Sequence, residues 1–174
     1  QNNMWPFFNH YTNYRARLTA LLQEASMFAD IGIMAPIADM WGDYGAQMEP
    51  FPTRVTPAYQ MLVWESIHQN GNACDYLSEQ VLADSKMENG FVHYGSRKYH
   101  TIFLIEVKSL YPATAKKLYE FVQNGGRIFC MEAYPDQSLG WNDYAKNDAE
   151  VKEWISKLKT FPDRFVFLNK PANN

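Results

Sequence analysis

The stretch Asn124-Gly-Gly-Arg-Ile-Phe-Cys-Met-Glu-Ala-Tyr-Pro135 joins the end of a helix, a strand and a sharp turn. Asn-Gly-Gly is typical of a helix C-terminus, because glycine adopts the left-handed backbone conformation there without steric cost. Residues 127–131 follow as a mostly apolar run, which suits a parallel strand covered on both faces. This segment therefore predicts an α/β unit in which a helix packs against the strand that follows it.

Four more segments outward from this one have the composition of strands. The run Ile31-Gly-Ile-Met-Ala35 is apolar and ends at Pro36, and residues 101–105 form the clearest strand in the chain. The remaining two strands are expected at 73–77 and 165–168, and 91–95 alternates like an edge strand or small hairpin. Helices are expected before and between the strands, at 9–29, 57–70, 78–82, 112–124 and 148–159.

Strands that alternate with helices indicate a parallel sheet with helices on both faces. We predict an α/β fold, a three-layer α/β/α sandwich whose five-stranded, mainly parallel sheet has the order 2-1-3-4-5. In such a sheet the ligand crevice lies at the carboxyl ends of the strands, between strands one and three. The loops 36–44, 106–111 and 132–141 are expected to meet there, the first as part of a long loop over 37–56.

The length and composition indicate one domain with a real core. A chain of 174 residues has the usual size of a single domain, and 47% of its residues are hydrophobic. We interpret residues 1–174 as one α/β domain, with an N-terminal helix at 9–29 and a core at 30–169. The chain opens on Gln1 and ends in a linker-like tail from Lys170. We therefore expect it to be excised from a larger protein.

Several classes of function are disfavoured. The net charge is −3 and the basic residues are not clustered, so we expect no nucleic-acid partner and no anionic membrane surface. No apolar run approaches the roughly 20 residues of a membrane span. The four histidines fall on different elements, and Cys74 and Cys130 lie far apart, so no metal site is expected. This spacing neither requires nor excludes a disulfide.

Cofactor motifs are also missing. The first predicted strand is followed by Ala35-Pro-Ile-Ala38, which has neither the glycines of a dinucleotide-binding loop nor the hydroxyls of a flavin phosphate cradle. The chain has no phosphate-binding P-loop and no Gly-x-Ser-x-Gly nucleophile elbow. We therefore expect no cofactor.

The segment 124–135 resembles the glutamine-amidotransferase-like superfamily, whose fold is flavodoxin-like. In active members a nucleophilic Cys occupies the turn after the strand, and a His and an acid follow near the end of the chain. Here Glu132 stands at that turn, Cys130 lies inside the strand, and no His follows His100. The resemblance thus implies the fold without the mechanism, and we expect Cys130 to be an inert, buried side chain.

A wider resemblance runs from about Tyr11 to Pro135. The passages 8–34, 74–82, 90–104 and 112–126 are similar, in order and spacing, to large multidomain glycoside hydrolases of the α-L-rhamnosidase-like kind. In the related β-galactosidases, a domain of this fold follows the catalytic barrel and can serve in trimer formation. The loop 40–54 and Glu106-Val-Lys108 depart from the family pattern.

This resemblance implies a non-catalytic accessory domain of a glycoside hydrolase acting in carbohydrate degradation. Such a domain packs against a catalytic barrel or a neighbouring subunit, and the catalytic carboxylates lie in the barrel. It also implies a secreted or periplasmic location. Its partners would be other domains of the parent chain, with a homo-oligomer and a carbohydrate ligand as further options. The alternative is a small Cys- or Glu-dependent hydrolase of the amidotransferase-like superfamily, with Cys130 or Glu132 as nucleophile.

The expected crevice loops contain candidates for contact with a sugar. Aromatic rings stack on the apolar faces of sugars, and carboxylates accept hydrogen bonds from sugar hydroxyls. The ligand-binding candidates are Trp41, Asp43, Tyr44, Tyr134, Asp136 and Trp141. We favour the other interpretation, in which these aromatic residues pack the loops onto the domain or its partner.

Glycoside hydrolysis needs two carboxylates roughly 5 to 9.5 Å apart. The acids on the crevice side are Asp39, Asp43, Glu49, Glu106, Glu132 and Asp136.

Overall fold

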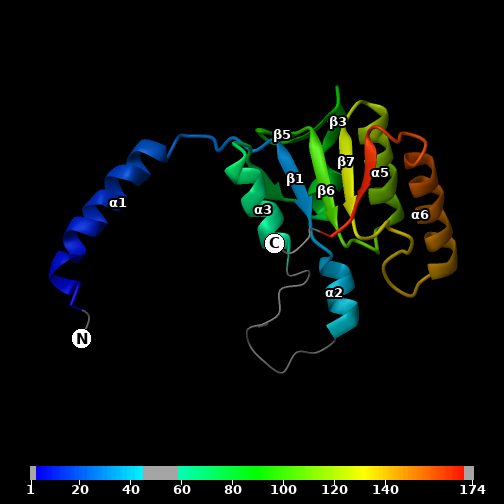
Figure 1. The fold of residues 1–174 in the computed structure, drawn as a ribbon, viewed down its shortest axis with the longest axis horizontal. Coiled ribbons are helices and arrows are strands. Elements are labelled where there is room, and N and C mark those ends of the chain that lie inside the picture. The colour runs from blue at the N-terminus through cyan, green and yellow to red at the C-terminus, as the bar shows by residue number, and fades with distance from the viewer. Residues whose placement is uncertain (1–2, 45–58, 171–174) are drawn as a thin grey trace.

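The computed structural model describes residues 3–44 and 59–170, and its centre is a sheet of five parallel strands (Figure 1). These strands are β1 (Ile31–Met34), β2 (Cys74–Tyr76), β6 (Thr101–Ile105), β7 (Arg127–Met131) and β8 (Phe165–Leu168). They lie in the order β2-β1-β6-β7-β8, and every neighbouring pair is parallel. Numbered along the chain, this is the predicted order 2-1-3-4-5, which is confirmed.

Helices cover both faces of the sheet, so the predicted α/β sandwich is confirmed. On one face α3 (Gln60–Gln69) packs Val63 and Ile67 against Ile31 and Ile33. The opposite face carries α4 (Glu79–Asp84), α5 (Pro112–Gln123) and α6 (Tyr144–Leu158). Their buried side chains pack with the sheet into the larger of two apolar cores. In the described ranges, no helix is both long and apolar enough to cross a membrane.

A second, antiparallel sheet lies between β2 and β6 in the sequence. It contains β3 (Lys86–Glu88), β4 (Phe91–Tyr94) and β5 (Arg97–Tyr99) in the order β3-β4-β5. The prediction of one edge strand or a small hairpin at 91–95 covers β4 and misses both β3 and β5. Asn89 and Gly90 form the two-residue loop between β3 and β4, and both have positive φ, 52° and 79°. Asn-Gly is the typical sequence for such a turn.

The predicted helix at 9–29 is shorter than expected. A 3-10 turn (Trp5–Phe7) leads into α1 (Phe8–Leu22), and residues 25–30 have no helical structure. The reason is that backbone groups of this connector form hydrogen bonds with the body of the domain. Asp30 donates its N–H to Ala73 O at 3.2 Å and accepts from His100 N at 2.9 Å. Tertiary hydrogen bonds therefore replace the helical ones, and α1 projects away from the sheet (Figure 1).

The predicted long loop at 37–56 is wrong for its first part, because residues Ile37–Tyr44 form helix α2. Pro36 precedes the helix and its carbonyl accepts from Met40 N at 2.9 Å, as expected for proline at a helix start. The rest of that loop, with Glu49 and the helix start at Thr56-Pro57, lies outside the described residues. Helix α6 also begins four residues before the expected Asp148.

At Gly126 the backbone approaches a buried side chain of helix α5 very closely. A Cβ atom at this position would lie 2.2 to 2.5 Å from ring atoms of Phe121, and Phe121 is fully buried. The glycine is thus required by the close approach of α5 to the start of β7.

We expect Gly126→Ala to lower the free energy of unfolding by about 2 kcal/mol, because overpacking forces a buried ring out of its place. Urea denaturation monitored by circular dichroism measures this. The control is Gly42→Ala in α2, where a Cβ meets no atom within 4 Å. That change should leave the stability unaltered or raise it by up to about 1 kcal/mol. Equal stability of the two variants would contradict the packing argument.

Candidate functional site

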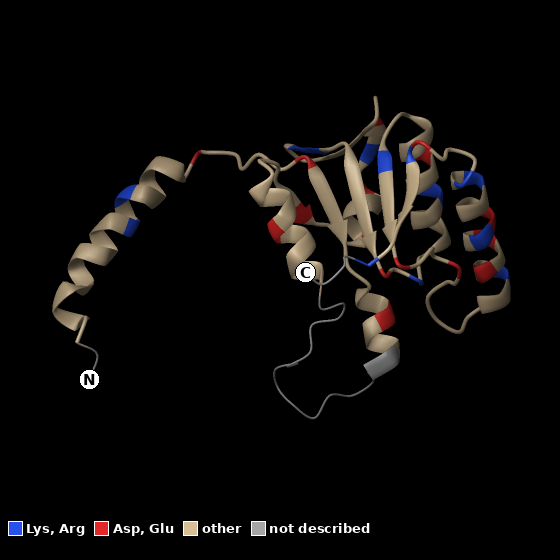
Figure 2. Cartoon of the chain, in the orientation of Figure 1, with Lys and Arg blue, Asp and Glu red and all other residues tan. Residues whose placement is uncertain are grey.

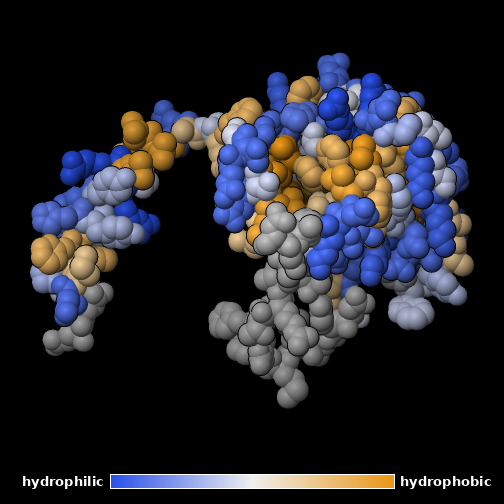
Figure 3. Space-filling model, viewed as in Figure 1, coloured by the Kyte–Doolittle hydropathy of each residue, from blue (hydrophilic) through white to orange (hydrophobic). Residues whose placement is uncertain are grey.

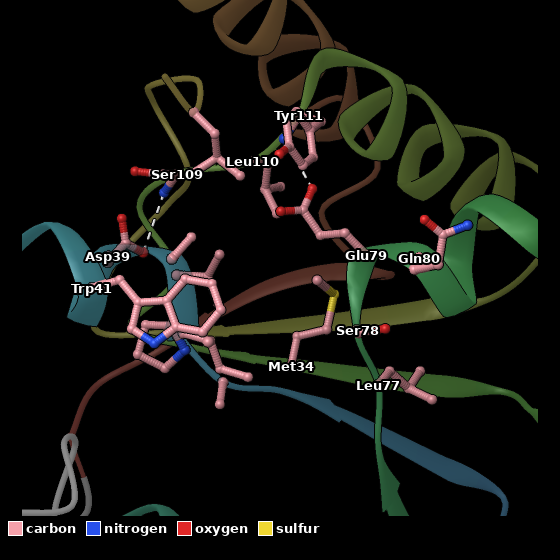
Figure 4. Close-up of a pocket in the computed structure, with 16 residues that line it drawn as sticks. Met34, Asp39, Trp41, Leu77, Ser78, Glu79, Gln80, Ser109, Leu110 and Tyr111 are labelled. Atoms are coloured by element: carbon pink, nitrogen blue, oxygen red, sulfur yellow. Dashed lines mark hydrogen bonds between the residues drawn. The ribbon is translucent and has the colours of Figure 1, made fainter. Parts of the chain in front are cut away.

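A pocket of about 520 Å³ opens at the carboxyl ends of β1, β2 and β6 (Figure 4). This is where the chain leaves β1 for β2 on one side and later returns to β6 on the other, which is the usual ligand position in parallel sheets. Its walls are mainly apolar, and the carboxylates of Asp39 and Glu79 also line it. The apolar walls include Met34, Ile37, Trp41, Leu77, Val107, Leu110, Tyr111 and Leu139.

The three loops that the strand order predicts to meet are hydrogen-bonded to one another here. Asp39 on α2 accepts from the backbone N–H groups of Lys108, at 2.9 Å, and Ser109, at 3.3 Å. Leu110 N donates to Gln137 O at 3.0 Å, and the Gln137 amide donates to Ser109 Oγ at 3.0 Å. The residues after β1, β6 and β7 therefore form one assembly, as expected from the order of the sheet.

Glu79 is a pocket residue that sequence reasoning missed. Its Oε2 accepts from Tyr111 N at 2.9 Å, and Ser78 caps α4 by accepting from Val81 N. Burial is the largest cause that raises the pKa of Glu79, hydrogen bonds from Thr114 and Tyr111 oppose it, and Asp39 adds to it. The signal was present, because Ser78-Glu79 follows the strand that neighbours β1. The carboxylates of Asp39 and Glu79 thus hold the loops in place.

The sugar-binding candidates do not come together as one site. Trp41 borders the pocket and is 77% exposed. Tyr134 instead packs against Phe165 and Phe167, with ring centroids 5.4 and 5.0 Å away. Both rings belong to β8, the strand at the far edge of the sheet from β2.

The remaining candidates also lie apart from the pocket or outside the description. Trp141 is 91% exposed and meets Tyr144 edge-on, at 6.3 Å between ring centroids. Asp136 is exposed, and its backbone N–H donates to Lys108 O at 2.9 Å. Asp43 and Tyr44 end α2, but their side chains are outside what the structure describes. Of the six candidates, Trp41 alone has a described side chain in the pocket wall.

Cys130 has the environment of a structural side chain. It is fully buried in the larger core, and burial raises the pKa of its thiol to about 12. Burial likewise raises the pKa of Cys74 to about 11, and both thiols are free. A nucleophilic thiol needs a depressed pKa and access to solvent, and Cys130 has neither. Within residues 3–44 and 59–170, no cluster of three His, Cys, Asp or Glu side chains could hold a metal ion.

Glu106 and Glu132 form a second unusual feature at this edge of the sheet. Each directly follows a strand, and each has a left-handed backbone conformation, with φ 52° and 65°. They are neighbours, because Glu106 N donates to Met131 O at 3.0 Å. Such conformations cost about 1 kcal/mol or more for residues other than glycine. Strained residues of this kind often stand at functional positions.

Tyr59 belongs to the smaller core and is near these carboxylates. It is only 4% exposed, and its hydroxyl has no hydrogen-bond partner of normal geometry among the described residues. Burial is the largest cause that raises its pKa, and the charges of Glu106 and Glu132 add to it. Sequence reasoning placed Tyr59 in a helix and did not connect it with the two acids.

Comparisons with protein-family models, with curated proteins and with solved structures found no match to this chain.

We expect Cys130 to resist thiol reagents in the native protein at pH 8 and to react fully once urea unfolds the chain. The pKa of the Cys130 thiol is about 12 in the folded state and about 8.5 in the unfolded state, so the folded state binds the proton more tightly. The stability from this group is present below pH 8.5 and is lost as the pH rises toward 12, by up to about 1.4 kcal/mol per pH unit. Urea midpoints between pH 8 and 10 measure the loss, and Cys130→Ala should show a smaller slope. Rapid labelling below neutral pH would contradict the structural role.

We expect Asp39→Ala to lower the free energy of unfolding by about 2 kcal/mol, because the N–H groups of Lys108 and Ser109 lose a charged acceptor. Thermal and urea unfolding measure the change. Asp136→Ala removes an exposed carboxylate from the neighbouring loop and should alter the stability by no more than about 0.5 kcal/mol. If both variants behave alike, Asp39 does not hold the loops together.

Proposed function

We propose that this chain is a non-catalytic accessory domain of a glycoside hydrolase acting in carbohydrate degradation, in a secreted or periplasmic enzyme. The observation that supports it best is the amount of apolar surface left uncovered in the described residues. No residue of α1 is buried, and its large apolar side chains are between 41% and 78% exposed. Exposed apolar surface of this extent is typical of an interface with another domain or subunit.

The proposal extends to the finer fold class. The strand order 2-1-3-4-5 is the one found in flavodoxin-like folds. Glu132 stands where the active amidotransferase-like enzymes carry their nucleophile, and Cys130 is two residues earlier and fully buried. This arrangement supports an amidotransferase-like domain that has lost its chemistry. In that case the catalytic carboxylates of the enzyme lie in a barrel elsewhere in the parent chain.

A Glu-dependent hydrolase is the second candidate, and one observation favours it. The strained Glu106 and Glu132 are neighbours, and both carboxylates act on the buried Tyr59 hydroxyl. Against it, the Glu132 carboxylate already accepts a hydrogen bond from the backbone N–H of Lys170, so one of its oxygens is occupied. We also keep carbohydrate binding at the pocket as a proposal, reduced to Trp41 as the stacking ring.

We expect the isolated chain to give no turnover on a panel of aryl glycosides and aryl esters, because Cys130 is buried with a raised pKa and Glu132 already accepts a hydrogen bond from Lys170. The release of nitrophenol measures this. Glu132→Gln is the matched variant, since it removes the charge and keeps the shape of the side chain. Turnover that survives purification and is abolished by Glu132→Gln would replace the accessory role with the hydrolase.

A further inference from the structure

No described helix covers the α3 side of the sheet over β6, β7 and β8. The strand registers align Phe103, Phe129 and Val166 across these strands, and the rings of Phe103 and Phe129 stack with centroids 5.1 Å apart. All three side chains, and Leu168 beside them, remain partly exposed. We call these four residues the open lane. Figure 3 shows apolar surface beside α3 in the middle of the body, and no described helix lies over it (Figure 1).

Helix α1 presents an apolar stripe of matching character. Phe8, Tyr11, Leu18 and Leu22 recur at helical spacing on one side, and all four are exposed. Arg15 lies on the same side, with its guanidinium 5.6 Å from the centre of the Tyr11 ring. Asn13 lies on the opposite side of the helix. With 15 residues, α1 is about 22 Å long, whereas β6 and β7, the five-residue strands of the lane, span about 16 Å. One α1 helix is therefore long enough to cover the open lane.

In this structure α1 lies away from the lane of its own chain (Figure 1). The guanidinium of Arg97 donates to the carbonyl of Met27 and lies 3.6 Å from the Asp75 carboxylate, which fastens the connector at β2. Residues 23–26 lie between this point and the helix, and the five steps from Met27 to Leu22 reach about 18 Å when the chain is fully extended. β7, at the centre of the lane, is three strand spacings from β2, about 14 Å, so α1 reaches its own lane only with a nearly extended connector. The path must also pass α3, which occupies the same face.

We propose that the open lane of one copy receives α1 of a second copy, and that the exchange is reciprocal, giving a dimer with twofold symmetry. Reciprocal exchange covers both lanes and both helices and leaves no further site open. The inference rests on the proposed function only in its role as an interaction domain, and it names the neighbouring subunit as a second copy of this chain.

The charges agree with this pairing. α1 contains Arg15 and Arg17 and no acid, whereas the rest of the chain has 14 basic and 19 acidic residues (Figure 2). Helices on parallel sheets usually run antiparallel to the strands. In that orientation the amino end of α1 lies toward Glu106 and Glu132, at the carboxyl end of the lane. Carboxylates are favourable partners for the positive end of a helix dipole.

Light scattering coupled to size exclusion tests the proposal on the whole chain. We expect a dimer, and we expect Leu18→Glu in the stripe and Phe129→Glu in the lane each to raise its dissociation constant about 100-fold or more. Asn13→Glu adds the same charge on the opposite side of α1 and should leave the dimer intact. Circular dichroism verifies that each variant is folded.

A photo-crosslinker at position 18 gives a measurement that does not depend on the Phe129→Glu variant folding. In a mixture of light and isotope-labelled chains, we expect cross-links from position 18 to the peptides of Phe103 or Phe129 of the other copy. A monomeric chain, cross-links within one copy, or a folded Phe129→Glu variant that still dimerises through its helices would each overturn the proposal. Glycoside turnover would refute the accessory role and leave the dimer standing, so the two failures are distinguishable.

Discussion

The pairing of β1 on both of its sides is the constraint on which the rest of the structure depends. β1 is hydrogen-bonded to β2 on one side and to β6 on the other. Ile33 is fully buried at its centre, and Gly32 has no room for a side chain, since a Cβ would lie 2.2 Å from Leu77 Cδ1. Because the chain leaves β1 in one direction and returns past it in the other, the loops separate at the carboxyl ends. The pocket opens in that gap.

The same topology leaves the two faces of the sheet unequally covered. The connections from β2 onward carry α4, α5 and α6 to one face, and the connection from β1 to β2 carries α3 to the other. One helix cannot cover five strands, so Phe103 and Phe129 stay partly exposed. Parallel sheets are normally buried on both faces, and from this we infer that the part no described helix covers is a surface for another element.

The site could be predicted in outline but not in detail. Strand order was enough to bring the loops after β1, β6 and β7 together, because the carboxyl ends of parallel strands share one edge. The positions of the side chains in these loops could not be predicted in the same way. Glu132 turns the chain through a left-handed conformation, and Tyr134 then packs on Phe165 and Phe167 and not in the pocket. No pattern in the sequence specifies the direction of that turn.

The sequence by itself determined the five strands of the main sheet, the helix end at Gly-Gly and the burial of Cys130, because short apolar runs and glycines act locally. Their order followed from the alternation of strands and helices, since right-handed crossovers leave few topologies. Tertiary structure alone decided the end of α1, because backbone groups of Asp30 and Met27 form hydrogen bonds with Ala73, His100 and Arg97. It also decided that Asp39 and Glu79 bind backbone N–H groups far away in the chain. Hydrogen bonds between residues 30 to 70 positions apart leave no periodic pattern in the sequence, so they cannot be predicted from it.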